Sequence, residues 1–395
     1  MNLLIVHNHY RLPGGEDTVV QNEYRLLKSM GHDVTLYERD NKELDTMTGF
    51  KRLRVPFGFI YSKKTAKDIT AIIKEKSIAV VMVHNTLTLI SPSVYYAAAR
   101  AGVPIIQTVH NFRLICPGAL LYRDGRICED CLKKGLHCAL KHRCYRNSFT
   151  QTLLCVISSR IHRKTGIYGR LHYICLTEFN KEKLKNLPGI REENIFVKPN
   201  FTAMSEEIIP YAERDNTFIY AGRLEEIKGT GELLEAWYLL ETKAKTPEEV
   251  PTLDLYGSGP MTETVRRFIE NHGLKRVILH EPLPHEDIIK TIARARALIL
   301  PTKWYEGFPM TITESFSVGT PVIGTDLGNT GDLIRGNLGA LISPDDMQGS
   351  IAHIIEAWDT FAYDESAFRA AATAYGEAEN KRLFTEILTR VTQQS

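Results

Sequence analysis

The strongest constraint on the fold is an alternation of short apolar segments with amphipathic segments, which runs along the chain twice. The apolar segments predict strands at 3–7, 32–37, 78–84, 103–110 and 173–176, and again at 217–221, 252–256, 277–280, 297–300 and 322–325. Helical patterns lie between most of these segments, for example at 18–30, 64–76 and 230–240. Short apolar strands that alternate with helices are typical of parallel sheets covered on both faces. The sequence therefore predicts an α/β protein with two similar halves.

The length and composition exclude several other classes. A chain of 395 residues with 43% hydrophobic and 24% charged residues matches ordinary globular proteins and not fibrous or disordered ones. No apolar run approaches the roughly 18 residues that span a bilayer. The first residues have no basic lead and only a short apolar run, unlike a secretory signal. We therefore expect a cytoplasmic protein that is at most peripheral at the inner face of the membrane.

The small net charge of +2 hides an asymmetry between the halves. Residues 1–175 contain 26 Lys and Arg against 13 Asp and Glu, whereas the remaining residues contain 23 against 34. Such an asymmetry suggests two domains with different partners. The basic half would suit anionic lipid, nucleic acid or an anionic substrate.

Five of the seven cysteines lie in one irregular segment, residues 113–147. Their spacing is Cys116-x11-Cys128-x2-Cys131-x6-Cys138-x5-Cys144, a Cys-x2-Cys knuckle flanked by single thiols. Without an export signal, metal binding is a better interpretation than disulfides. We predict a structural zinc ion on Cys116, Cys128, Cys131 and Cys144, with Cys138 as the alternative fourth ligand. Unligated reduced thiols and redox chemistry are the competing interpretations.

The passage from Trp304 to Glu314 carries the strongest chemical signal. It follows an apolar strand, and a helix that begins near Pro309 would present free N–H groups to an anion such as a phosphate. Gly307 would let a ligand approach the backbone. Glu306 and Glu314 could hydrogen-bond sugar and ribose hydroxyls, although a capping Glu306 and a solvated Glu314 are the alternative.

Glu306-Gly307-Phe308-Pro309 with Glu314 resembles the paired-glutamate motif of the retaining glycosyltransferases of family 4, which have the GT-B fold. Ala221-Gly222-Arg223-Leu224 with Lys228-Gly229 resembles that family's arginine and lysine at a strand end. Gly14-Gly15 resembles the family's N-terminal glycine loop. The family's segment that leads into a core strand resembles Gly319-Thr320-Pro321-Val322-Ile323. The motifs stand in the family's order from residue 3 to about 345.

The resemblance implies two Rossmann-like domains that face each other across a cleft. A cluster of Pro and Gly between 180 and 215 marks the boundary. We expect an acceptor-binding domain at 1–185 with the cysteine-rich insert at 113–147, and a nucleotide-sugar-binding domain at 186–365. We expect the helices of 366–395 to cross back to the first domain. Many family members lack such an insert, so the insert would mark a subgroup.

The resemblance also assigns roles to residues. Arg223 and Lys228 would clamp the donor diphosphate, where fixed cations stabilise the departing phosphate without reorganisation. No Asp-x-Asp motif stands at a strand end, so we expect no catalytic divalent metal. His110 would contact the donor sugar and Glu306 would act beside it as the second catalytic residue. The remaining donor-binding residues would be Gly15, Gly257, Gly307, Phe308, Pro309, Met310, Thr311 and Glu314.

The predicted reaction is retaining transfer of a sugar from a nucleotide-diphosphate sugar to a glycan or lipid-linked acceptor, in surface polysaccharide or glycoconjugate assembly. Residues 51–64 add a candidate membrane surface, with Lys51, Arg52, Arg54, Lys63 and Lys64 around Phe57, Phe59 and Tyr61. The main alternative is a zinc-containing nucleic-acid-binding protein that uses the basic half. An NAD-dependent oxidoreductase is a weaker option, because Gly257-Ser258-Gly259 lacks the third glycine of a dinucleotide fingerprint.

Overall fold

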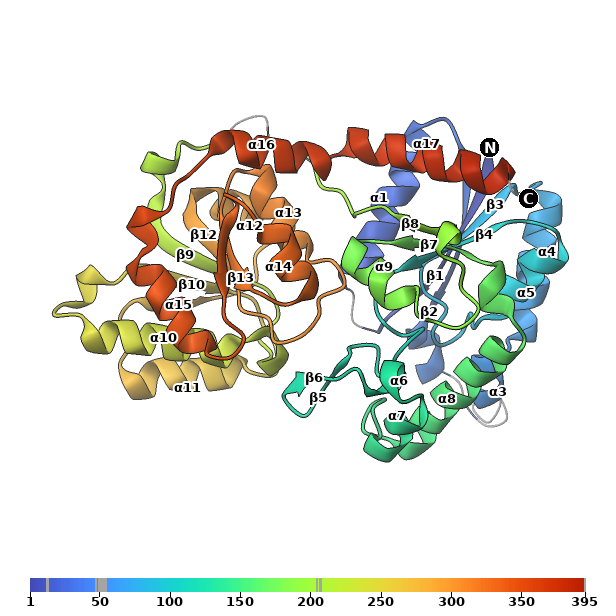
Figure 1. Ribbon diagram of the computed structural model, residues 1–395, viewed down its shortest axis with the longest axis horizontal. Helices are drawn as coiled ribbons and strands as arrows, with labels where there is room; N and C mark the ends of the chain where they lie inside the picture. The colour runs from blue at the N-terminus through green and yellow to red at the C-terminus, as the bar shows by residue number, and fades with distance from the viewer. Residues whose placement is uncertain (12–13, 47, 49–54, 204, 206–207, 394–395) are drawn as a thin grey trace. The chain divides into compact units, whose positions relative to one another are not determined.

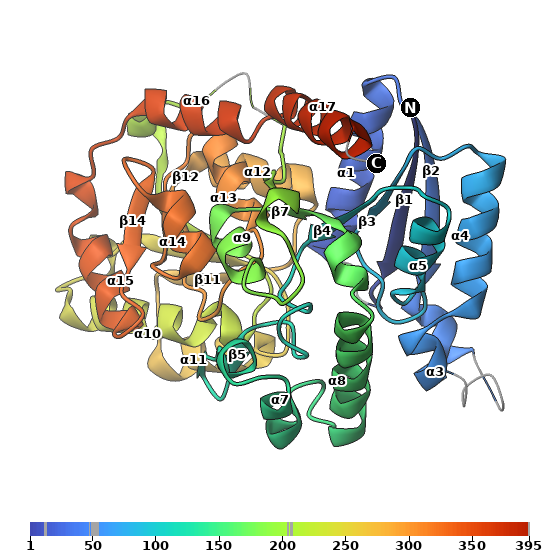
Figure 2. The ribbon, with the colours of Figure 1, turned by 45° about the vertical axis from the view of Figure 1, so that its right-hand side comes forward.

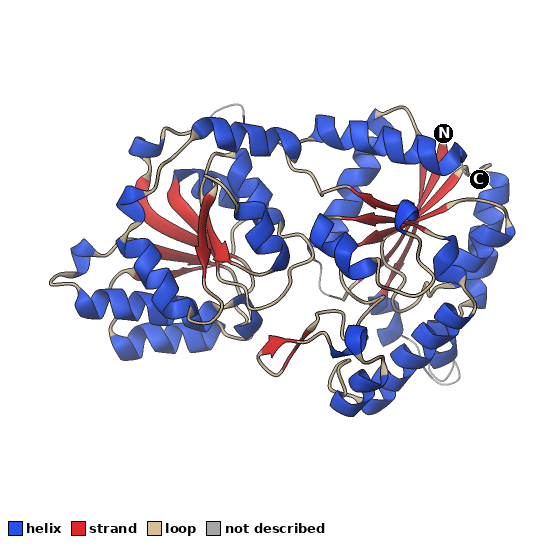
Figure 3. Ribbon diagram, viewed as in Figure 1, coloured by secondary structure: helices blue, strands red, loops and turns tan. Residues whose placement is uncertain are grey.

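The computed structural model describes residues 1–11, 14–46, 48, 55–203, 205 and 208–393. The chain divides into two compact units. The first unit contains residues 1–121, 128–200 and 377–395, and the second contains residues 122–127 and 201–376. Each unit is a parallel sheet with helices on both faces (Figures 1 and 3). The predicted α/β architecture with two Rossmann-like domains is therefore confirmed.

The first unit is built on a six-stranded sheet with the order β2-β1-β3-β4-β7-β8, in which every pairing is parallel. Its strands are β1 (Asn2–His9), β2 (Asp33–Asp40), β3 (Val80–Val83), β4 (Ile105–Val109), β7 (His172–Cys175) and β8 (Ile195–Val197). Strands β1, β3, β4 and β7 are largely buried, because both faces of the sheet are covered there, whereas the edge strand β2 is mostly polar and only partly buried.

Helices pack on both faces of this first sheet (Figure 2). They are α1 (Gly15–Ser29), α3 (Val55–Ile60), α4 (Lys63–Glu75), α5 (Ser93–Arg100), α8 (Phe149–Lys164), α9 (Glu178–Leu184) and α17 (Glu377–Gln393). One cluster of buried side chains joins the sheet to α4, α5 and α9. Between β4 and α8 lie β5 (Tyr122–Arg123), β6 (Arg126–Ile127), α6 (Asp130–Lys133) and α7 (His137–His142). The predicted irregular segment therefore contains short elements of its own.

The second unit has a six-stranded parallel sheet with the order β11-β10-β9-β12-β13-β14. Its strands are β9 (Asp215–Ala221), β10 (Thr252–Tyr256), β11 (Val277–His280), β12 (Ala295–Leu300), β13 (Val322–Thr325) and β14 (Gly339–Ile342). The chain direction across the sheet reverses between β9 and β12. Open α/β sheets bind ligands beyond the carboxyl ends of the strands at such a switch point.

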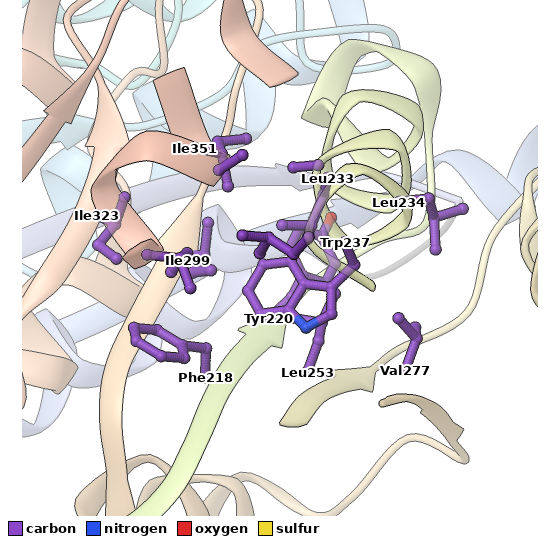
Figure 4. Packing of buried hydrophobic residues seen from close by; sticks show 14 of the residues in the cluster. Phe218, Tyr220, Leu233, Leu234, Trp237, Leu253, Val277, Ile299, Ile323 and Ile351 are labelled. Atoms are coloured by element: carbon purple, nitrogen blue, oxygen red, sulfur yellow. The ribbon is translucent and has the colours of Figure 1, made fainter. Parts of the chain in front are cut away.

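The helices of the second unit are α10 (Thr230–Lys243), α11 (Thr262–His272), α12 (His285–Arg294), α13 (Met310–Ser317), α14 (Gly328–Ile334), α15 (Met347–Glu356) and α16 (Glu365–Ala374). The core on one face centres on the buried indole of Trp237 from α10 (Figure 4). Tyr220 of β9, Leu253 of β10 and Ile299 of β12 lie around it, and Ile351 of α15 belongs to the same cluster. This core holds the ends of β9 and β12 in fixed positions.

The boundary between the units differs from the predicted one at 185/186. Residues 186–200 belong to the first unit, because β8 pairs with β7 in register from Tyr173 with Ile195 to Cys175 with Val197. The two C-terminal helices, predicted to cross back together to the first domain, belong to different units. Helix α16 packs on α13 in the second unit, whereas α17 belongs to the first unit and packs on α1. Among the described residues, no helix is both long and apolar enough to cross a membrane.

Candidate functional site

The loop that follows β12 places the Glu306 carboxylate at the switch point of the second sheet. Three donors converge on one of its oxygens, Oε1: Lys228 Nζ at 2.7 Å, Trp304 Nε1 at 2.9 Å and Thr302 Oγ1 at 3.0 Å. Glu306 is buried. An ionised carboxylate at such a site needs hydrogen bonds and a cation to offset its lost hydration. The arrangement therefore fixes the carboxylate in one orientation.

Asn329 fixes the backbone of the same loop. Its fully buried side-chain amide donates to the carbonyl oxygens of Glu306 at 2.5 Å and Gly307 at 2.8 Å. Helix α13 begins directly afterwards, with Pro309 as the residue before its first turn. The helix was predicted to begin near Pro309, and the extended backbone conformation of Pro309 makes this residue its cap. The first N–H groups of α13 therefore lie beside Glu306, Gly307 and Phe308 in the chain.

Two glycines let the neighbouring loops approach each other. Gly229 has φ +74°, and a side chain there would overlap the carbonyl oxygen of Pro301 at the end of β12. Gly257 has φ +148°, and a side chain there would overlap the carbonyl oxygen of Gly222 at the end of β9. Backbone positions of this kind require glycine. The loops after β9, β10 and β12 therefore pack backbone against backbone at the carboxyl edge of the sheet.

The other predicted donor-site residues have separate partners. Arg223 is 62% exposed in its side chain and forms an ion pair with Glu225. Glu314 is buried in α13, and its Oε1 lies 2.9 Å from Nε2 of His285. The alternative of a solvated Glu314 is therefore wrong. Lys228 and Glu306 are in direct contact, whereas no hydrogen bond or ion pair given for the described residues joins Arg223 or Glu314 to that pair.

In the first unit, His110 follows β4 and lines a partly open pocket together with His84, Asn111 and Arg113. Its Nε2 lies 2.9 Å from Nδ1 of His84, and the two rings are stacked. Burial is the main cause that lowers the pKa of both histidines well below its ordinary value. Nearby His7 and Lys198 lower both pKa values further, and Glu23 opposes the lowering only at His110. Both rings are therefore neutral near pH 7, which suits hydrogen bonding more than charge stabilisation.

A fully buried ion pair lies behind these histidines. Glu23 of α1 has Oε2 3.4 Å from Nε2 of His84, and its Oε1 lies 2.9 Å from Nζ of Lys198. Lys198 also donates to the side chain of Asn380 on α17 at 3.0 Å and lies over the ring of Phe384. The chain of contacts from Glu23 through His84 to His110 orients the ring that lines the pocket.

Gly15 is exposed and is the first residue of α1. Two residues later, Asp17 accepts from the backbone N–H of Gly14 at 2.8 Å and contacts His7 Nε2 at 2.8 Å and His9 Nδ1 at 2.9 Å. Burial raises the pKa of Asp17, but these hydrogen bonds outweigh burial and lower it to about 2. The ionised Asp17 therefore ties the start of α1 to the end of β1.

Sequence reasoning missed Asn329, His285, His84, Glu23 and Lys198. Each acts across a long separation in the chain, so no local pattern identifies it. A fully buried Lys or Glu is rare without a partner, but burial of this kind is visible only in the fold. Residues 51–54 of the predicted membrane surface lie outside the described residues, and Phe59 is buried rather than available for insertion.

Two family models match the chain in succession. The N-terminal residues 13–205 match "Glycosyltransferase Family 4", and residues 204–371 match "Glycosyl transferases group 1". The change from one model to the other falls close to the boundary between the two structural units. The two matches together cover most of the chain.

Curated relatives resemble part of the chain. The lipopolysaccharide 1,6-galactosyltransferase of Salmonella typhimurium is 31% identical over 186 residues, which cover 45% of this chain and 50% of that protein. The O-antigen chain mannosyltransferase B of Escherichia coli is 28% identical over 176 residues, 44% of each protein. The chain thus matches about half the length, or less, of these relatives.

Solved structures resemble the whole chain in fold. The apo form of the lipopolysaccharide outer core galactosyltransferase WaaB has a TM-score of 0.65 at 16% identity and covers 99% of both chains. Anabaena Alr3699/HepE in complex with UDP has a TM-score of 0.66 at 15% identity, over 99% of this chain and 100% of that one. At these identities the likeness supports the fold alone.

Proposed function

Because the chain belongs to the glycosyltransferases matched by its two halves, we propose that it transfers a sugar from a nucleoside-diphosphate sugar to a glycan or lipid-linked acceptor. The process would be the assembly of a surface polysaccharide or glycoconjugate. Relatives named for lipopolysaccharide and O-antigen synthesis support this process. The UDP complex of a protein with the same fold supports a nucleotide donor.

The observation that carries the proposal is the hydrogen bonding of Glu306. Among the residues described, its recorded hydrogen bonds all end on Oε1, so Oε2 is left for a ligand. A carboxylate with one oxygen fixed by the protein, and with no recorded protein partner on the other among the described residues, is suited to accept a hydrogen bond from a sugar or ribose hydroxyl. The site stands at the switch point where α/β sheets bind nucleotides.

Donor cleavage places negative charge on the departing diphosphate, and this unit offers groups to receive it. Lys228 Nζ is already held beside Glu306, Arg223 is exposed nearby in the chain, and the first N–H groups of α13 follow the Glu306 loop. Fixed donors of this kind stabilise charge that develops in the transition state. We propose that these groups, and no divalent metal, bind the diphosphate.

The proposed reaction retains the anomeric configuration. The bond from the anomeric carbon to the diphosphate oxygen breaks, and the acceptor hydroxyl oxygen bonds to that carbon on the same face. The acceptor proton passes to the departing phosphate oxygen. We assign to His110 a hydrogen bond to the donor sugar, which its neutral ring can make.

We also propose that the first unit docks on anionic lipid, with α8 as part of the docking surface. Ile157, Arg160, Ile161 and Lys164 are exposed and follow the i, i+3, i+4, i+7 spacing that places them on one face of the helix. Phe57 on the neighbouring α3 is 76% exposed. A face that combines apolar and basic side chains suits the boundary of an anionic membrane.

Thermal unfolding in the presence of UDP, GDP, ADP, CMP and free phosphate tests the proposed donor class. One nucleoside diphosphate should raise the unfolding temperature more than phosphate does, since a bound ligand stabilises the folded state. Salt-sensitive binding of DNA or RNA without any nucleotide effect would favour the nucleic-acid alternative instead. No contact in the described residues favours that alternative at present.

A further inference from the structure

Three side chains that can bind metals converge in the first unit, where β1 ends and α1 begins. His7 and His9 lie on β1, and Asp17 lies in the first turn of α1. One potential ligand atom of each residue lies within 4.8 Å of those of the other two, and no other three His, Cys, Asp or Glu residues among those described form such a group. Local sequence patterns do not reveal this group, because a strand and a helix contribute to it.

The three side chains meet at one carboxylate oxygen. Asp17 Oδ1 lies 2.8 Å from His7 Nε2 and 2.9 Å from His9 Nδ1. The two histidines reach the same oxygen because side chains two residues apart in a strand lie on one face of the sheet. Ligand atoms of a tetrahedral zinc ion stand about 3.3 Å apart when each lies about 2.0 Å from the metal. Small side-chain shifts would therefore make room for an ion between these atoms.

Further contacts orient these side chains, as they commonly do for the ligands of metal sites. The other oxygen of Asp17, Oδ2, accepts from the backbone N–H of Gly14 at 2.8 Å. The other ring nitrogen of His9, Nε2, lies 2.9 Å from Oε1 of Glu38 on β2. The side chain of His7 is fully buried, so the surrounding packing fixes its ring.

The charges around the group also favour a cation. Asp17 and Glu38 supply two carboxylates, and neither forms an ion pair with a lysine or arginine in the part of the chain that the structure describes. A neutral imidazole has one N–H, so His9 could donate to only one of the two carboxylates that face its ring. A metal ion on Nδ1 would let Nε2 donate to Glu38 and would offset both negative charges. The alternative is a doubly protonated His9 ring, which binds no metal.

We propose that His7 Nε2, His9 Nδ1 and Asp17 Oδ1 bind one Zn²⁺ ion, with water in the fourth position. Imidazole nitrogens together with a carboxylate oxygen suit zinc. Three protein ligands leave one position of a tetrahedral ion open. The side chains of His9 and Asp17 are 29% and 16% exposed, so water reaches the group.

The cysteines that the sequence predicts as zinc ligands are arranged differently. Cys116, Cys131 and Cys138 are buried, and Cys128 and Cys144 are partly buried. All five belong to the described residues, yet no three of their sulfurs lie within 4.8 Å of one another. Zinc binding by these thiols therefore stays a prediction from their spacing, whereas the ligand atoms of the histidine group already converge.

A bound ion would tie the first turn of α1 to the end of β1. Through Asp17 it would also hold the N–H of Gly14, which precedes the predicted donor-binding residue Gly15. The hydrogen bonds of Asp17 join the same elements without an ion, so zinc should add stability and should not be required for transfer. The zinc site is therefore independent of the function proposed above, in which no divalent metal binds the diphosphate.

Calorimetric titration of chelator-treated full-length protein with zinc chloride tests the proposal. The wild-type protein should bind one ion at this group. Loss of an orienting contact in Glu38→Gln should weaken binding about 10- to 100-fold, and loss of a ligand in His9→Gln or Asp17→Asn should weaken it more. His32→Gln is the matched control, since His32 is a partly exposed histidine of the same unit outside the group, and it should bind zinc as the wild-type protein does.

Two further measurements separate this group from the cysteines and from a purely structural role. Cys128→Ser/Cys144→Ser should keep the site, and cobalt bound to this variant should lack the intense absorption of sulfur ligation. Zinc at about 100 times its dissociation constant should raise the unfolding temperature of the wild-type protein by about 5 °C, and His9→Gln should lose this increase. Wild-type protein that binds no zinc, an equal zinc effect in wild-type and His9→Gln protein, or loss of zinc binding in folded Cys128→Ser/Cys144→Ser would overturn the proposal.

Discussion

The ammonium group of Lys228 lies 2.7 Å from Oε1 of Glu306, although 78 residues separate them in the chain. Lys228 comes from the turn before α10 and Glu306 from the loop after β12, so the contact joins the two strands that flank the switch point. The same lysine lies 5.6 Å from the centre of the Trp304 ring. The pair is therefore held in position before any ligand arrives.

Replacing Lys228 should affect both ligand binding and folding. Lys228→Met removes the cation that neutralises buried Glu306, so transfer should slow by the equivalent of about 2–4 kcal/mol. Unfolding in urea should also become easier, since a buried carboxylate loses its partner. Arg223→Ala should slow transfer by a similar amount without changing stability, because Arg223 is exposed.

The matched control is Lys243→Ala, which removes an exposed lysine paired with Glu356 far from the loop in the chain. It should change neither stability nor activity measurably. Unchanged turnover in both Lys228→Met and Arg223→Ala would show that neither residue binds the diphosphate.

The orientation of Glu306 should matter as much as its charge. Trp304→Phe keeps the aromatic ring but removes the Nε1 donor at 2.9 Å. Loss of a hydrogen bond to a charged group costs about 1.5–3 kcal/mol, so kcat should fall roughly 10- to 100-fold. Circular dichroism should stay unchanged, and a normal kcat would contradict the role of the carboxylate.

Removing one partner of the buried Glu23–Lys198 pair should lower the free energy of unfolding more than replacing both partners with apolar residues. Lys198→Met leaves Glu23 buried without its cation and should lower the free energy of unfolding by about 3–5 kcal/mol. The double variant Glu23→Leu/Lys198→Met should recover part of that loss. The double variant should still slow transfer, because His84 loses the carboxylate that lies 3.4 Å from it.

Acid should destabilise the protein through His162. Burial lowers its pKa to about 4, against 6.5 in the unfolded chain, although its hydrogen bond to Ile60 opposes the shift. The unfolded chain therefore binds more protons below pH 6.5, so the stability is full above pH 6.5 and falls towards pH 4. At pH 5 this group alone should cost about 2 kcal/mol relative to pH 7.

Urea unfolding at pH 7 and pH 5 checks this expectation. His162→Gln should reduce the difference in unfolding free energy between the two pH values. His353→Gln, a change at an exposed histidine, should not. An equal pH dependence of the unfolding free energy in wild-type and His162→Gln protein would show that His162 does not cause the loss of stability in acid.

The regular parts of the fold follow from local pattern. The strands at Thr252–Tyr256, Val277–His280 and Val322–Thr325 have the predicted limits, because apolar runs between turn residues define them. Strand β8 and strand β14 were not predicted: β8 has only three residues and lies in the segment rich in Pro and Gly, and β14 begins with a glycine.

The candidate site was predictable only where it follows a motif. Glu306 and Lys228 belong to recognisable passages, and the fold brings them into contact. Asn329 and His285 lie on other elements, and their hydrogen bonds to the Glu306 loop and to Glu314 arise from the tertiary fold alone. The exposure of Arg223 and the burial of Phe59 likewise depend on packing that the sequence does not display.

The most direct test of the central claim is transfer from a panel of nucleoside-diphosphate sugars in the presence of EDTA, with the product's anomeric configuration measured by NMR. The account predicts that one donor is used without divalent metal, that the configuration is retained, and that Lys228→Met loses most of the rate. Inversion, dependence on a divalent ion, or no reaction and no binding with any nucleotide sugar would contradict it.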